Sequence, residues 1–513
     1  MRFAALALPL LLTAPAARGQ EPTKNDLLRA VEKQLRAAHE AAGPCVACVV
    51  VSRSDQYPKP PGGVPGALGA FDRKQFLKDN PRAKPAAVRE LDLSDPRTIP
   101  DHGFACGVVI DDKGLLLTPY HVIEGATKIY VHLPGRPGSY ADIHAADARN
   151  DLAVLKLITP PPGLRAITFG DVKLTAGREK ATVVPGTLVV LMANAFAANV
   201  PLDRPSAALG SVTNVHANGV AANSESVEKL RSYYYHGPLL EHDAKLNAGV
   251  SGAALLNLDG ELIGLTTTAA VLGSGERGPE YALPVDDKCR RIIDVLKRGE
   301  EVEYGYLGVS LVTGRNNFNP NVVQIGATVP NGPSALAGLR ENDIITHIDG
   351  VRIRKYEELL TSISAALAGS KVTLTVQRRD RTLTVPVTLG KMVHWQAFIA
   401  SVRPDPVFGL RVDHRDIFVQ GKNNNTQIEL AGVPAGVSVS EVAPGSPAAA
   451  AFKKLGDNPK QWLITHVNGT GVGDPAGFYA AAKDQKAVKL TVIDPREPTG
   501  PGGTRRTREV SLP

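Results

Sequence analysis

The stretch Asn247-Ala248-Gly249-Val250-Ser251-Gly252-Ala253-Ala254-Leu255 places a serine between two glycines, ahead of an apolar run that is typical of a strand. A serine hydroxyl becomes a useful nucleophile when an adjacent base takes its proton and backbone N–H groups face the oxyanion that forms. Glycines on both sides allow a turn tight enough to aim two amides at one point. Because Gly-x-Ser-Gly is also common in ordinary turns, the motif alone leaves a structural serine as an open alternative.

Two upstream segments supply the base and the buried carboxylate that a catalytic serine needs. His121 lies just past an apolar strand, in Thr118-Pro119-Tyr120-His121-Val122. Asp151 enters an alternating apolar strand, Asp151-Leu152-Ala153-Val154-Leu155-Lys156, where its side chain can be buried. A turn histidine or a strand-entry aspartate would explain either residue alone. Together, in the order His, Asp, Ser, they favour a catalytic triad.

These motifs resemble those of the HtrA/Deg family of trypsin-like serine proteases with PDZ domains. The family's Thr-x-x-His-Val motif is matched by residues 118–122, and Asp-Leu-Ala-Val-Leu-Lys is matched in full by residues 151–156. Its Gly-Asn-Ser-Gly-Gly-Pro-Leu motif is matched in part by residues 249–255. The resemblance runs from about residue 103 to the C-terminus. It implies a mostly β fold, a chymotrypsin-like double six-stranded β-barrel followed by two PDZ domains.

The resemblance also implies the roles of the site residues. Ser251 would be the nucleophile, His121 the general base and then acid, and Asp151 the residue that fixes the imidazole, while the amides of Gly249 and Ser251 would form the oxyanion hole. The serine motif departs from the family where Val250 replaces Asn, and where Ala253 and Ala254 replace Gly and Pro. A β-branched Val250 favours extended backbone, so a weak or inactive barrel acting as a PDZ-based scaffold or chaperone is the alternative.

Composition indicates a globular protein of about three domains, because the chain has 513 residues, 43% of them hydrophobic and 21% charged. The 49 glycines and 39 prolines fit a loop-rich, mostly β protein. The net charge of +7 is spread along the chain, so nucleic-acid binding is not supported.

The N-terminus resembles a secretory signal, since Met1-Arg2-Phe3 precedes an apolar run over residues 4–17. That run is short for a membrane span. We therefore expect export to the periplasm or secretion, with no stable membrane insertion after signal removal; an uncleaved anchor is the alternative.

The chain divides into segments that composition and motifs delimit. They are a signal peptide (1–19), an N-terminal helix (20–44), a protease domain (45–285) with an insertion loop (53–100), a linker helix (286–303), a first PDZ domain (304–390) and a diverged second one (402–513). A regulatory role is expected for the insertion, and the resemblance alone suggests a homotrimer or larger homo-oligomer.

An internal repeat marks the two expected PDZ domains. Ile344-Ile345-Thr346-His347-Ile348-Asp349-Gly350 is echoed by Leu463-Ile464-Thr465-His466-Val467-Asn468-Gly469, and the recurring histidines indicate a structural position. The first copy begins with Tyr306-Leu307-Gly308-Val309, which resembles the family's carboxylate-binding loop, so these four residues are the expected peptide-binding site. The second copy has only Val407-Phe408-Gly409-Leu410, and a spacer role remains open for both.

The expected activity is that of an exported serine endopeptidase acting on unfolded or damaged proteins and peptides. The stretch Leu265-Thr266-Thr267-Thr268-Ala269 matches the family's specificity pocket and holds no acidic residue, so cleavage after small apolar residues is expected. No metal or organic cofactor is expected.

Four cysteines leave one pairing open. If the strands that carry Cys48 and Cys106 pair antiparallel, these two residues come within bridging distance, and export would permit oxidation. Buried thiols are the alternative.

Overall fold

The computed structural model describes fourteen longer segments and a few short pieces of the chain. They are residues 24–54, 103–174, 181–194, 204–216, 238–246, 249–267, 280–312, 322–329, 332–364, 366–392, 399–415, 434–456, 461–495 and 505–513, with 77–78, 81, 92–95 and 497. The expected signal peptide and most of the 53–100 insertion lie outside the described residues.

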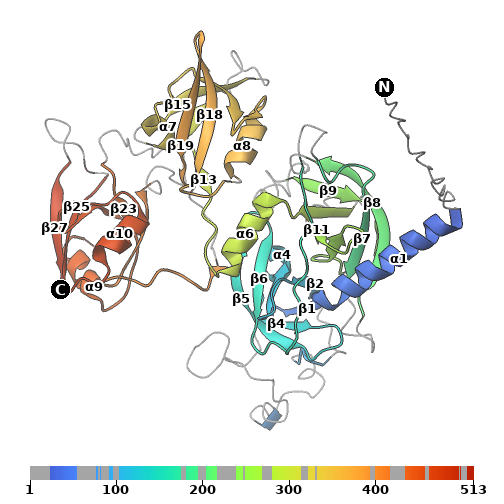
Figure 1. Cartoon of the computed structure of the whole chain (residues 1–513). Coiled ribbons are helices and arrows are strands. Elements are labelled where there is room, and N and C mark those ends of the chain that lie inside the picture. Colours follow the sequence, from blue (N-terminus) through green and yellow to red (C-terminus); the bar gives the residue numbers. More distant parts are fainter. Residues whose placement is uncertain are drawn as a thin grey trace, which may run out of the picture.

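The N-terminal part of the fold is a six-stranded barrel (Figure 1). Its strands follow the order β5-β4-β1-β2-β3-β6, and pairing of β5 with β6 closes the barrel. Its strands are β1 (Val46–Ser52), β2 (Phe104–Val109), β3 (Leu115–Thr118), β4 (Lys128–His132), β5 (Ser139–Asp147) and β6 (Leu152–Leu157). The Val-rich β1 is buried along its whole length, as expected for a strand with apolar neighbours on both faces.

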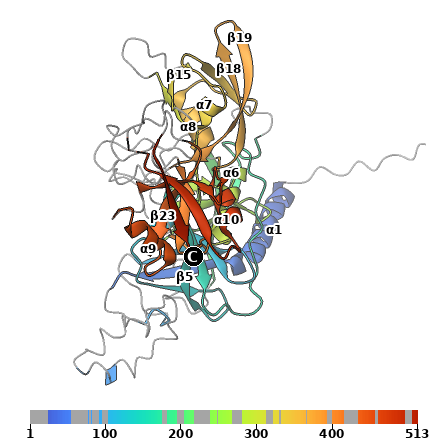
Figure 2. The same cartoon turned by 90° about the vertical axis from the view of Figure 1, so that its left-hand side faces the viewer.

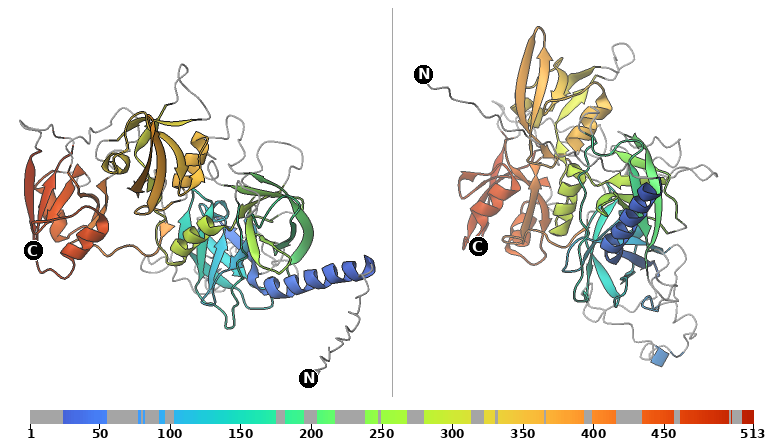
Figure 3. Two further views of the ribbon diagram at one scale, coloured as in Figure 1. Left: turned by 45° about the horizontal axis from the view of Figure 1, so that its top comes forward. Right: turned by 45° about the vertical axis from the view of Figure 1, so that its right-hand side comes forward.

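A second closed barrel follows, with the order β10-β11-β12-β9-β8-β7, and Figure 3 shows it nearly end-on as a ring. Its strands are β7 (Leu188–Ala193), β8 (Ser206–His216), β9 (Leu239–His242), β10 (Ala254–Leu256), β11 (Leu262–Thr267) and β12 (Glu280–Pro284). One apolar cluster contains residues of both barrels, among them Leu116, Val154, Met192 and Leu256. The shared cluster fixes how the barrels meet, and it confirms the expected chymotrypsin-like fold class.

Two longer helices flank the barrels. Helix α1 (Lys24–Ala42) runs alongside them (Figure 3), where Gln34 donates a hydrogen bond to Asp259 at 3.0 Å; a 3-10 turn, η1 (Gly43–Cys45), leads from it into β1. Helix α6 (Asp287–Lys297) follows the second barrel, and the Asp286 carboxylate caps it by accepting from the backbone N–H groups of Lys288 and Cys289. No helix among the described residues is long and apolar enough to cross a bilayer.

The first C-terminal module is a sheet with the order β14-β15-β16-β18-β19, on which β17 pairs with β16; β13 and β20 pair at its base. Its elements are β13 (Gly305–Tyr306), β14 (Val309–Leu311), β15 (Val323–Thr328), α7 (Pro333–Leu336), β16 (Ile344–Ile348), β17 (Val351–Arg352), α8 (Tyr356–Ser364), β18 (Lys371–Arg378), β19 (Arg381–Thr388) and β20 (Gly390–Lys391).

The second C-terminal module repeats this strand order as β22-β23-β24-β26-β27, with β25 on β24, and Figure 2 shows the two modules as separate sheets. Its elements are β22 (Leu410–His414), β23 (Val437–Val442), α9 (Pro447–Lys453), β24 (Leu463–Val467), β25 (Thr470–Gly471), α10 (Pro475–Ala482), β26 (Val488–Ile493) and β27 (Thr507–Leu512). The recurring His347 and His466 sit alike, each with Nδ1 3.0 Å from the hydroxyl of the preceding threonine.

A short strand between the modules, β21 (Ile399–Ala400), joins the first barrel instead of either module. It pairs antiparallel with β5, Ile399 opposite Ala146 and Ala400 opposite Ala145. Ser401 extends the contact, because its backbone N–H donates to the His144 carbonyl at 2.9 Å.

Of the two alternatives for Cys48 and Cys106, the structure shows buried free thiols. Strands β1 and β2 do pair antiparallel with Cys48 opposite Cys106, but neither thiol is in a disulfide bond. The reason lies in the side-chain environments: Cys48 packs in an apolar cluster with Tyr130 and Tyr140, whereas the Cys106 thiol donates to the Gly249 carbonyl at 3.4 Å.

The buried histidine of β9 predicts acid sensitivity of the fold. His242 is 1% exposed, and burial lowers its pKa from 6.5 to about 4. The unfolded chain therefore takes up a proton below about pH 6.5 that the folded chain refuses until about pH 4, so stability falls across that window as pH falls. We expect His242→Leu to flatten the decline of Tm between about pH 7 and pH 5, measured by calorimetry. The exposed His466, changed to Leu, is the control that should keep the wild-type slope; equal slopes in all three proteins would contradict the assignment.

Candidate active site

Ser251 lies in a turn ahead of β10 whose backbone favours glycine at two positions. Gly249 and Gly252 adopt left-handed backbone, with φ of 84° and 79°. A Cβ on Gly252 would collide with the carbonyl oxygen of Cys106 and would lie 2.8 Å from Cδ of Pro119. The close approach brings the serine turn against β2 and against the segment that carries the histidine.

Backbone and hydroxyl groups of both barrels hold this turn. The Thr266 hydroxyl of β11 donates to the Val250 carbonyl, and the Gly252 N–H donates to the Thr266 carbonyl at 2.8 Å. From the first barrel, the Cys106 N–H donates to the Ser251 carbonyl at 2.7 Å. Ser251 is thereby fixed across the barrel interface and keeps 7% of its surface exposed.

His121 sits on the one-turn helix α4 (Tyr120–Ile123), which begins directly after Pro119. The extended Pro119 turns the chain out of β3, and Thr118 anchors that end of the strand by donating its hydroxyl to the Cys106 carbonyl at 2.9 Å. The His121 Nε2 lies 3.1 Å from Ser251 Oγ. This distance allows the proton exchange that activates a serine.

Asp151 completes the arrangement from the turn between β5 and β6. Its side chain has no exposed surface, and its Oδ2 lies 2.7 Å from His121 Nδ1. The other oxygen, Oδ1, accepts the backbone N–H of His121 at 2.7 Å, while the Thr267 hydroxyl donates to Oδ2 at 3.4 Å. A carboxylate held this way favours the imidazole tautomer with its proton on Nδ1, leaving Nε2 to act as a base.

Cys106 is excluded as an alternative nucleophile by its environment. Burial raises the pKa of its thiol to about 12, so the thiol stays protonated near neutral pH. No group of three or more His, Cys, Asp or Glu side chains placed to hold a metal ion occurs among the described residues.

The residues that depart from the family's serine motif are buried apolar side chains of the second barrel. Val250 is buried in an apolar cluster of the second barrel with Leu191 and Ala253, so the larger apolar side chain fills core space. Ala254 begins β10, has no exposed surface and pairs with Leu265 of β11.

Sequence reasoning missed the groups that hold the site in place, chiefly Cys106, Thr266 and Thr267. The first works through its backbone N–H and carbonyl, which every residue type has, and so leaves no signal. The threonines stood in a run of three, Thr266 to Thr268. Neighbouring side chains of a strand point to opposite faces, and only the folded position of β11 decides that Thr267 faces Asp151 while Thr266 faces the serine turn.

The expected peptide-binding loop lies in the first module, at the start of its sheet. Tyr306 ends β13, Leu307 is buried, Gly308 is left-handed with φ of 75°, and Val309 begins β14. Ser334 ties the loop down, because its hydroxyl donates to the Gly308 carbonyl at 2.6 Å. Strand β14 is the terminal strand of the described sheet, which is where an added peptide strand would pair.

The matching loop of the second module is closed on itself. Val407 and Leu410 exchange both backbone hydrogen bonds, at 3.0 and 2.9 Å. The Leu410 N–H is therefore already used inside the loop.

Comparisons with known proteins agree with this architecture. A family model described as a trypsin-like peptidase domain matches residues 105–265, and a PDZ domain model matches residues 305–389. The periplasmic pH-dependent serine endoprotease DegQ of Escherichia coli is 30% identical over 368 residues, covering 70% of this chain and 72% of DegQ.

The periplasmic serine endoprotease DegP of the same organism is 29% identical over 363 residues, covering 68% of this chain and 67% of DegP. The solved structure of the HtrA-type protease AlgW with a decapeptide is 21% identical, with a TM-score of 0.46, and covers 70% of this chain and 99% of that one. The identity and coverage shared with DegQ place the present chain in the HtrA/DegP family of trypsin-like serine endoproteases with a PDZ domain.

Proposed function

We propose that the chain is an exported serine endopeptidase whose catalytic residues are Ser251, His121 and Asp151. The observation that carries the proposal is the unbroken hydrogen-bonded series across the two barrels, with 3.1 Å from Ser251 Oγ to His121 Nε2 and 2.7 Å from His121 Nδ1 to Asp151 Oδ2. Its members occupy the geometry that activates a serine for acyl transfer.

In the proposed reaction, Ser251 Oγ bonds to the scissile carbonyl carbon while its proton passes to His121 Nε2. Asp151 stabilises the resulting imidazolium, and the backbone N–H groups of Gly249 and Ser251 hold the oxyanion. The imidazolium then gives its proton to the leaving amine as the C–N bond breaks. Water, deprotonated by His121, releases the acyl group and restores the serine hydroxyl.

Location and assembly are proposed from the relatives. DegQ and DegP are named as periplasmic endoproteases, and together with the N-terminal sequence this supports a periplasmic enzyme. Unfolded or damaged proteins are the proposed substrates. A homotrimer or larger homo-oligomer is supported by the family resemblance alone.

The proposed domain limits are 45–285 for the protease, 286–303 for the linker and 304–390 and 402–513 for two PDZ domains. The identical strand order of both modules supports a second PDZ domain. We assign peptide capture to the first module, through Tyr306, Leu307, Gly308 and Val309, because the corresponding loop of the second is closed.

Changing Ser251 to Ala tests the catalytic assignment. Removing the nucleophile should lower kcat on unfolded casein by about a million-fold, as complete loss of a triad serine does elsewhere. Binding of casein and labelling of the protein should be measured together: a fluorophosphonate should label the wild type at Ser251 and leave Ser251→Ala unlabelled, while both forms bind casein. Ser511 of β27 is exposed, and Ser511→Ala is the control with full activity.

Equal casein cleavage by wild type and Ser251→Ala would defeat the assignment. Absence of cleavage and of labelling in the wild type would favour a binding scaffold.

Substrate preference should follow from the uncharged strand after the serine. The described part of the expected pocket, Leu265 to Thr267 in β11, is buried and carries no charge, and burying a substrate cation there without a carboxylate would be costly. A peptide library should show cleavage after Val, Ala, Ile and Leu. A profile dominated by Lys or Arg would contradict this.

Peptide capture predicts dependence on a free carboxylate and on Gly308. In the Ser251→Ala background, an apolar C-terminal peptide should bind with an affinity that Gly308→Val weakens roughly tenfold, because a β-branched residue resists the left-handed conformation. Fluorescence anisotropy with free-acid and amidated peptides measures both effects. Gly369→Val is the matched control, since Gly369 has φ of 78° and open space around it. Equal binding of the amidated peptide would argue against carboxylate capture.

A further inference from the structure

The turn from Asp147 to Asp151 contains a buried polar cluster that the triad does not use. The Asp147 carboxylate, 7% exposed, accepts hydrogen bonds from the Tyr304 hydroxyl, from Asn150 Nδ2 at 2.8 Å and from the Arg149 backbone N–H at 3.2 Å. Asn150 Nδ2 also contacts the Tyr304 hydroxyl. A residue from far along the chain thus closes the turn that presents Asp151.

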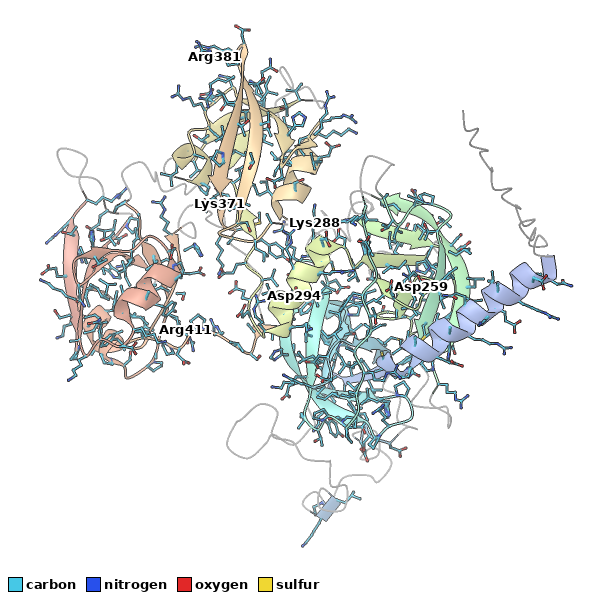
Figure 4. The ribbon with its side chains drawn as sticks, in the orientation of Figure 1. Asp259, Lys288, Asp294, Lys371, Arg381 and Arg411 are labelled. Carbon is cyan, nitrogen blue, oxygen red and sulfur yellow. The ribbon has the colours of Figure 1, made fainter. Side chains whose placement is uncertain are left out.

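The side chain of Tyr304 packs in the barrels, whereas its backbone is hydrogen-bonded to the first module. The side chain is 2% exposed and is part of the apolar cluster of the barrels. Its carbonyl accepts the Met392 N–H at 2.7 Å, and it forms a β-bridge with Leu367. Helix α6, on which Figure 4 labels Lys288 and Asp294, leads from the second barrel to this junction.

The exit of the first module meets the same turn. The Arg149 guanidinium stacks over the Tyr304 ring, 4.6 Å from its centroid, and its Nη1 donates to Met392 Sδ at 2.9 Å. Strand β21 pairs with β5 immediately before the turn, at Ala145 and Ala146. Segments at both ends of the module therefore converge on residues 145–150, next to the triad carboxylate.

The turn needs such support because of its backbone. Asp151 has φ of 51°, a left-handed conformation that non-glycine residues hold only where the surroundings impose it. Its own N–H makes a long bond, 3.4 Å, to the Ala148 carbonyl. Burial raises the pKa of the Tyr304 hydroxyl well above its ordinary value, so the hydroxyl keeps the proton that it donates to Asp147.

We infer that Tyr304 is a positioning residue for Asp151: through Asp147 its hydroxyl fixes the turn, and so it links the base of the first module to the alignment of the triad carboxylate. The inference rests on the proposed function, since alignment matters only if Asp151 supports His121 in catalysis.

The test is Tyr304→Phe in the full chain, which removes the hydroxyl and keeps the ring. With a peptide substrate too short to reach the modules, kcat should fall about tenfold while KM stays within about twofold, because orientation is lost and binding is not. The rate of fluorophosphonate labelling should fall by the same factor. Asp147→Asn should behave alike, and the double variant should be no slower than the slower single variant, because both changes weaken one hydrogen bond.

Tyr479→Phe is the matched control in the second module, where the Tyr479 hydroxyl accepts the Val412 N–H at 3.3 Å, far from the triad in sequence. Its kcat should equal that of the wild type. A lower Tm for Tyr304→Phe with unchanged kcat and labelling, measured well below both melting temperatures, would make the hydroxyl merely structural and overturn the inference. If Tyr304→Phe does not fold, Asp147→Asn decides by the same criteria. A wild type unlabelled at Ser251 would overturn this inference together with the proposed function, whereas an active wild type matched by Tyr304→Phe would overturn the inference alone.

Discussion

The site depends on two barrels meeting at one imidazole. His121 and Asp151 come from the first barrel and Ser251 from the second, so a small slip between the barrels would part the hydroxyl from its base. Three features resist a slip: the apolar cluster shared by both barrels, the hydrogen bond from the Cys106 N–H to the Ser251 carbonyl, and the absence of a side chain on Gly252, which lets the two backbones touch. Such a slip would leave Asp151 with His121, since both belong to the first barrel, and would remove only the contact that activates the serine.

Much of this architecture could be predicted from the sequence. The resemblance carried by the motifs around His121, Asp151 and Ser251 implied paired barrels, and both barrels are present. The structure also brings those three side chains within hydrogen-bond distance. Two kinds of contact could not be predicted. Cys106 supports the serine turn through backbone atoms, which every residue type has. Thr267 contacts Asp151 because its side chain lies on the opposite face of the strand from that of Thr266. Whether Cys48 and Cys106 form a bridge stayed open for a related reason, since register makes residues neighbours without deciding where their thiols pack.

In the C-terminal half, too, some features could be predicted from the sequence and others could not. The repeat around His347 and His466 predicted two modules of one design, and their strand orders agree. No local pattern indicated, however, that the backbone of Val407 bonds to that of Leu410 or that Tyr304 contacts both the barrel and the first module. Such features join residues that are far apart in the chain, and periodicity reports only on local neighbours.

The small strand β21 has a consequence for the order of events during synthesis. Strand β5 is complete at residue 147, yet its edge at Ala145 and Ala146 is covered only when residues 399 and 400 arrive. A chain that emerges from its N-terminus can close the first barrel long before then, because all six strands of that barrel precede residue 158. Contacts between residues so far apart in the chain form late. The nascent protease domain would therefore carry an unpaired strand edge until residues 399 and 400 have been synthesised. The sheet of the first barrel is thereby completed only after the whole first module has been synthesised.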